Sequence, residues 1–165
     1  MEETLKKVAN AIFAANGQAL TSICKDLECE EYAGYNALIG KLNIKFRKAK
    51  ITPKKIGQFV TLWKRNSQGQ TEPFHASDNF DFYIIATETA SRFGIFLFPR
   101  HVLCDKHILS AQVAGKRGFR VYPDWDIPEN SQATRTKEWQ SAFFIDLTHP
   151  EGKGIDKLSL HLNQY

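Results

Sequence analysis

The feature of this sequence with the clearest chemistry is a run of positive charge in its first half. Between Glu31 and Glu72 the chain has nine Lys and Arg residues and no Asp or Glu. The remaining residues hold thirteen cations and eighteen anions, so the rest of the chain is net acidic although the overall charge is +4. Clustered Lys and Arg side chains attract phosphates, and each phosphate neutralised releases counterions. The charge pattern therefore indicates a phosphate-binding surface.

The strongly basic segment from Lys41 to Arg65 is predicted to form two strands joined by a turn. Because strand side chains alternate between two faces, the apolar Ile44 and Phe46 share one face with Lys48 and Lys50. The two lysines are thus expected to emerge at the rim of a buried face. A rim of this kind suits contacts with backbone phosphates.

A second basic cluster lies close to Tyr122 and Trp125. Arg side chains beside aromatic rings are typical of surfaces that stack on bases or contact sugar-phosphate groups. The residues predicted to contact phosphates, from both regions, are Arg47, Lys48, Lys50, Lys54, Lys55, Lys64, Lys116, Arg117 and Arg120. A structural interpretation remains open, because edge strands often carry Lys against aggregation and charge runs are often only solvated faces.

Motifs for other chemistry are absent from the sequence. There is no Gly-rich phosphate loop, nucleophile elbow or dinucleotide fingerprint. His101, Cys104 and His107 are three residues apart, but zinc needs three or four ligands and no fourth lies nearby. We therefore expect no metal site of this kind and no cofactor.

Length and composition favour one domain, residues 1–165, since 165 residues leave no room for two independent cores. No apolar run approaches the ~20 residues that cross a bilayer, and the charged start does not resemble a secretory signal. Three sparse cysteines are typical of a reducing compartment. These features predict a bacterial-type cytoplasmic protein without a membrane partner; the sequence leaves the oligomeric state open.

Periodicity predicts an α+β fold. Apolar residues at helical spacing predict helices over 3–16 and 131–147, with Ser131 as the N-cap of the second, and a short one over 156–162. Strands are expected over 20–25, 34–39, 43–49, 57–64, 80–86, 93–98 and 118–122; the nearly unbroken apolar runs at 80–86 and 93–98 should be central. The expected architecture is a mixed, mostly antiparallel sheet of about five to seven strands, with N- and C-terminal helices packed on it.

Several blocks of the chain resemble the MepB family of bacterial proteins. The longest runs from Phe46 to Arg65 (FRKAKITPKKIGQFVTLWKR), and the others are residues 78–82 (DNFDF), 94–100 (GIFLFPR) and 115–123 (GKRGFRVYP), with Trp125-Asp126, Gln132-Ala133 and Trp139-Gln140. The resemblance covers residues 28 to 147. It implies a fold similar to the restriction-endonuclease-like, nucleic-acid-binding architecture.

A nuclease of that architecture uses an Asp, then an Asp/Glu-x-Lys on the next strand, to hold Mg²⁺ and position the attacking water. Asp81 is a candidate for the first carboxylate, and Glu30 for an assisting upstream one. The strand that follows Asp81 reads FGIFLFPR and has neither a carboxylate nor a Lys. The nuclease motif is therefore incomplete, which favours binding over cutting.

The sequence thus predicts a non-catalytic or weakly catalytic nucleic-acid-binding protein, with DNA as the expected partner. One alternative is a metal-dependent nuclease or phosphate-ester hydrolase with a divergent Mg²⁺ site at Asp81. Another is an adaptor that binds an acidic protein through the same cations.

Overall fold

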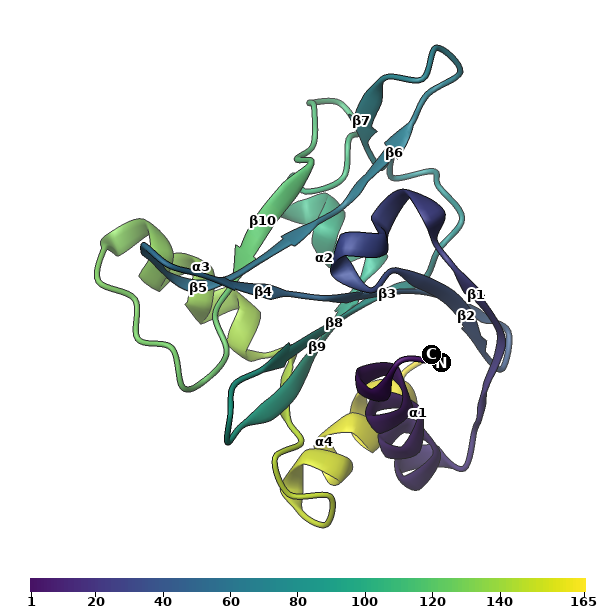
Figure 1. Cartoon of the computed structure of the whole chain (residues 1–165), viewed down its shortest axis with the longest axis vertical. Coiled ribbons are helices and arrows are strands. Elements are labelled where there is room, and N and C mark those ends of the chain that lie inside the picture. Colours follow the sequence, from purple (N-terminus) through teal and green to yellow (C-terminus); the bar gives the residue numbers. More distant parts are fainter.

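The computed structural model describes all residues 1–165 and is built around a six-stranded mixed sheet (Figure 1). Its strands, in spatial order, are β1 (Leu20–Lys25), β2 (Tyr35–Ile39), β3 (Leu42–Lys48), β8 (Phe82–Glu88), β9 (Phe93–Pro99) and β11 (Phe144–Asp146). Strands β3 and β8 are parallel and all other neighbours are antiparallel. The predicted α+β class and the size and mixed character of the sheet are confirmed.

The two terminal helices, α1 (Glu3–Asn16) and α4 (Lys153–Leu162), cover one face of this sheet and lie side by side in Figure 1. Leu5, Val8 and Ile12 fall on one side of α1 and are almost completely buried, as their helical spacing predicts. Leu158 and Leu162 of α4 join the same core. No helix in the chain has the length and apolarity needed to cross a membrane.

A smaller sheet covers the opposite face. It consists of β10 (Gly118–Val121), β5 (Lys55–Thr61) and β4 (Lys50–Thr52), in that order. The remaining elements are η1 (Leu27–Tyr32), a hairpin of β6 (Trp63–Arg65) and β7 (Thr71–Pro73), α2 (Arg100–Asp105) and α3 (Ser131–Ser141). In β8, Ile84 packs toward the terminal helices while Tyr83 and Ile85 pack toward the smaller sheet. The central strands are therefore buried on both faces, as their unbroken apolar sequence predicts.

The basic segment is extended on both sides of a turn at residues 53–54, as predicted, but its strands are divided between the two sheets. Strand β3 belongs to the large sheet. Its pairing with β8 continues as far as a hydrogen bond of 2.9 Å from the Ala49 backbone amide to the Ala86 carbonyl. From Lys50 onward the chain crosses to the smaller sheet and forms the β4–β5 hairpin. The cations of β3 are consequently separated from Lys54 and Lys55, which lie at the hairpin turn.

Residues 131–147 are not a single helix either. Helix α3 ends at Ser141, and Phe144–Asp146 pairs with β9 as strand β11. These residues form a strand because Phe144 and Ile145, which are neighbours in sequence, pack into opposite cores. Side chains alternate in this way along a strand but not along a helix. The N-cap is Asn130 rather than Ser131, since the Asn130 side-chain oxygen accepts from the Ala133 amide at 2.9 Å.

Replacing Asn130 by Ala should lower the free energy of unfolding by about 1 kcal/mol, because the first turn of α3 loses its cap. Urea denaturation monitored by circular dichroism would measure the change. Ser131→Ala serves as the matched control and should shift the midpoint much less. Equal effects of the two substitutions would contradict the assignment of the cap.

Candidate nucleic-acid interface

Arg47 lies in the protein interior, contrary to the expectation that it contacts phosphates at the surface. Its side chain is 1% exposed and forms an ion pair with Asp26, just before η1. One guanidinium nitrogen also donates to the Phe46 carbonyl at 2.7 Å, while its Nε has no partner. The cause is that β3 is an inner strand covered on both faces. Arg47 therefore holds η1 against the sheet and offers nothing to a ligand.

Three other cations that the sequence predicts to contact phosphates, Lys48, Lys50 and Lys64, are at the surface but face carboxylates. Lys48 pairs with Glu88, and Lys50 lies 3.7 Å from Glu31.

Lys64 donates to Asp78 at 2.7 Å. Burial alone would raise the pKa of Asp78, but hydrogen bonds from the Lys64 ammonium and the His75 amide outweigh it and hold that pKa below its usual value.

Arg117 has no carboxylate partner; its guanidinium donates to the Thr71 carbonyl at 2.9 Å.

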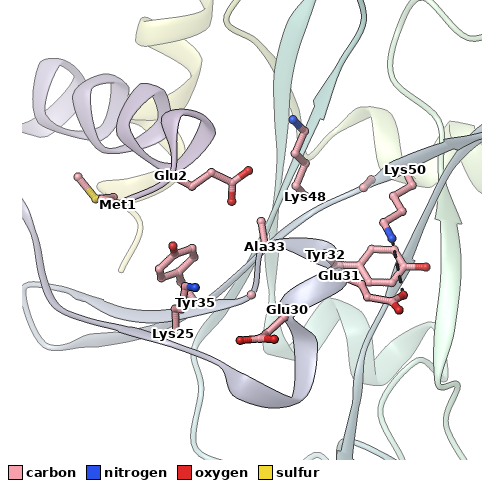
Figure 2. A pocket seen from close by; sticks show the side chains of 12 residues that line it. Met1, Glu2, Lys25, Glu30, Glu31, Tyr32, Ala33, Tyr35, Lys48 and Lys50 are labelled. Carbon is pink, nitrogen blue, oxygen red and sulfur yellow. Dashed lines mark ion pairs between the residues drawn. The ribbon is translucent and has the colours of Figure 1, made fainter.

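Lys48 and Lys50 border a hollow of about 650 Å³ (Figure 2). It lies between the residues just before α1, the end of η1, the start of β2 and the end of β3. Glu2 and Glu30 extend from opposite sides of this hollow, and Lys50 turns toward Glu31. Cations and carboxylates are thus interleaved here. The local potential is mixed, which does not favour a polyanion.

A second hollow, of about 640 Å³, has a different character. We call it the basic groove; its cations are Lys54, Lys55, Lys106, Lys116 and Arg120, and its aromatic residues are Phe59, Phe119, Tyr122 and Trp139. Glu129 is the one carboxylate on its wall. None of the five cations takes part in an ion pair. The groove therefore concentrates uncompensated positive charge in a concave surface.

Pairing of β5 with β10 brings the two predicted basic regions together in this groove. Arg120 stands opposite Phe59 in the register. A side chain at Gly118 would lie 2.6 Å from the Phe59 ring, so the absence of a Cβ lets that ring lie across β10. The Arg120 guanidinium donates to the Gly57 carbonyl at 3.2 Å and to the Thr52 hydroxyl at 2.8 Å, tying β10 to the lysine-bearing hairpin turn.

The other side of the groove is formed by residues just after α2, by α3 and by the loop before β10. The Lys116 amide donates to the Ile108 carbonyl at 2.9 Å, which holds this loop near the end of α2. Lys106 follows α2 directly, and its Nζ lies 5.4 Å from the centre of the Trp139 ring. Sequence reasoning missed Lys106, because neither its spacing nor a nearby cation marks it as part of a cluster.

The two carboxylates proposed for catalysis are not brought together. The Asp81 carboxylate accepts a hydrogen bond of 2.7 Å from the backbone amide of Asn43, at the start of β3. Glu30 is exposed on η1, beyond the other end of that strand. No group of three or more His, Cys, Asp or Glu side chains in the chain is placed to hold a metal ion. In this structure Asp81 organises the entry to β3 and β8.

Comparison with known proteins gives one family. The family model for MepB-like proteins matches residues 26–146, a range that includes the whole basic groove. Among solved structures, the crystal structure of MepB is similar with a TM-score of 0.78 and 28% identity, covering 90% of this chain and 99% of that one. A bacterial homing endonuclease is similar only at a TM-score of 0.43 and 14% identity, over 85% and 87% of the two chains. No curated protein matches the sequence.

Proposed function

The chain belongs to the MepB-like family, and we propose that it binds nucleic acid, with DNA as the first ligand to test, through the basic groove. The observation that carries this proposal is the contrast between two sets of cations. Arg47, Lys48 and Lys50 are paired with carboxylates, whereas Lys54, Lys55, Lys106 and Lys116 have no ion-pair partner. Unpaired ammonium groups in a concave site are free to bind phosphates.

The arrangement also favours a ligand that carries several phosphates. The cations come from three separate parts of the fold, the β4–β5 turn, the end of α2 and β10 with its preceding loop, and so border the groove on several sides. A chain of phosphates can contact several such cations in succession, whereas an isolated small anion would use one or two. A polymeric anion is therefore the ligand that the groove fits best.

Binding should weaken steeply with salt. If five phosphates are neutralised, the slope of log K against log[salt] should be about −3.5 for a single strand and about −4.5 for a duplex, or roughly a 100-fold loss or more between 50 and 200 mM salt. Fluorescence anisotropy of labelled DNA oligonucleotides would measure this slope.

Three outcomes would overturn the proposal. One is a lack of binding at 50 mM salt, and another is affinity that does not change with salt. The third is capture of an acidic protein partner that survives nuclease treatment while oligonucleotides do not bind. Mg²⁺-dependent cleavage that disappears in Asp81→Ala would instead support the enzyme alternative.

A further inference from the structure

We propose that Lys45 is a nucleophilic lysine and a site of covalent acylation by small acyl phosphates. The side chain belongs to β3, an inner strand of the large sheet, and stands opposite Asn36 of β2 in the register. It is half-buried, so its amine is largely removed from bulk water but still accessible to a small reagent. Lys45 is not among the residues of the basic groove, and the proposal is therefore independent of nucleic-acid binding.

Lys45 is the one cation of β3 without a carboxylate partner. Arg47 and Lys48 on the same strand form ion pairs, whereas Lys45 forms none. Its ammonium instead donates to the Asn36 side-chain oxygen at 3.0 Å and lies 4.5 Å from the centre of the buried Phe74 ring. Both neighbours are uncharged. A half-buried ammonium with neutral neighbours gains little that would offset its lost hydration.

The charges around Lys45 also favour the neutral amine. Arg47 follows two residues later on the same face of β3, and its buried guanidinium repels a second positive charge. Burial lowers the pKa of Lys45, and the Arg47 charge lowers it further. These two effects exceed the opposing influence of the acidic groups on neighbouring segments, which are Asp26, Asp78 and Cys29.

The ring of Phe74 does not reverse this balance. A cation–π contact favours the charged form only weakly at a partly exposed site. The Lys64 ammonium lies 5.9 Å from the centre of the same ring and brings a further positive charge, although Lys64 is itself paired with Asp78. Lys45 is therefore placed to react as a neutral amine.

The reaction is the transfer of an acyl group. Only a neutral amine attacks an acyl carbon, and an ordinary lysine is neutral to about 0.1% at pH 7.5. The Nζ lone pair forms a bond to the carbonyl carbon, the bond from that carbon to the phosphate oxygen breaks, and phosphate leaves with the electron pair while Nζ loses a proton to water. The product amide keeps an N–H for Asn36 and no longer repels Arg47, so the fold accommodates it.

The test treats the intact protein with acetyl phosphate at a series of pH values from 7 to 10 and quantifies the acetylation of each lysine by peptide mass spectrometry. Lys41 is the internal control, since it is exposed in the turn just before β3 and forms no ion pair. The ratio of Lys45 to Lys41 acetylation should favour Lys45 near pH 7. It should fall severalfold by pH 10, because an ordinary lysine loses its proton only in that range.

Asn36→Asp places a carboxylate beside the Lys45 ammonium and should lower the acetylation of Lys45 at pH 7.5 roughly tenfold, because an adjacent opposite charge favours the charged form. Asn10→Asp adds the same charge at an exposed position on α1 and should leave the ratio unchanged.

A ratio of Lys45 to Lys41 acetylation that does not change with pH would overturn the proposal, as would the absence of Lys45 acetylation at pH 7.5. Equal acetylation of Lys45 in the folded Asn36→Asp and Asn10→Asp variants would also contradict it. The pH series uses the unmodified protein, so it decides the proposal whether or not either variant folds. None of these outcomes depends on whether the basic groove binds DNA.

Discussion

Replacing Lys54, Lys55 and Lys116 together by Gln should lower the affinity for DNA roughly 100- to 500-fold at 0.1 M salt. Each phosphate contact contributes about 0.7 (single strand) to 0.9 (duplex) to the slope of log K against log[salt]. Because 0.1 M lies one decade below 1 M salt, losing one contact lowers the affinity at 0.1 M by about 0.7 to 0.9 log units. All three side chains are exposed and free of ion pairs, so their replacement leaves the fold intact. Anisotropy titrations over a series of salt concentrations would give both the affinity and the slope, which should become shallower by 2 to 3 (about 0.7–0.9 per lysine).

The matched control removes the same charge elsewhere. Lys6, Lys41 and Lys153 are exposed, unpaired and outside the groove. Because charges separated by more than the Debye length of about 10 Å are largely screened at 0.1 M salt, the triple Gln variant of these lysines should change affinity only severalfold. If the two triple variants lose affinity equally, binding is a property of net charge and the groove is not its site.

Asp26→Ala should reduce the free energy of unfolding by about 3–5 kcal/mol. The substitution leaves the Arg47 guanidinium, which is 1% exposed, without its counter-charge. It also removes the side-chain oxygen that accepts from the Glu28 amide at the start of η1. Urea denaturation of the intact protein would measure the loss.

Asp26→Asn separates these two contributions, since it keeps an acceptor for the Glu28 backbone amide but removes the charge. We expect it to lower the free energy of unfolding nearly as much as Asp26→Ala does. Combining Asp26→Ala with Arg47→Met should recover part of it, because a buried apolar pair is often as stable as a buried ion pair. Glu31→Gln breaks an exposed pair with Lys50 and should cost less than about 1 kcal/mol. A loss below about 1 kcal/mol for Asp26→Ala would mean that η1 does not depend on this pair.

Local pattern was sufficient for most elements of the fold. The helical spacing of Leu5, Val8 and Ile12 predicted α1, and the unbroken apolar runs predicted β8 and β9 as central strands. These predictions succeed because periodicity reports directly which faces a segment must bury. Prediction failed at residues 144–146, where the helix-like sequence after Trp139 continues into a strand only because β9 offers an edge to pair with.

The sequence by itself determined that positive charge is concentrated in two regions, and it placed Lys54, Lys55, Lys116 and Arg120 in them. Only the tertiary structure decided which cations are free. The position of β3 inside the sheet buried Arg47, and carboxylates distant in sequence paired with Arg47, Lys48 and Lys50. The β5–β10 register joined the two remaining groups into one groove, to which the fold adds Lys106 from the end of α2 and Trp139 from α3. Ion pairing and concavity arise from contacts between distant segments, so no local pattern could reveal them.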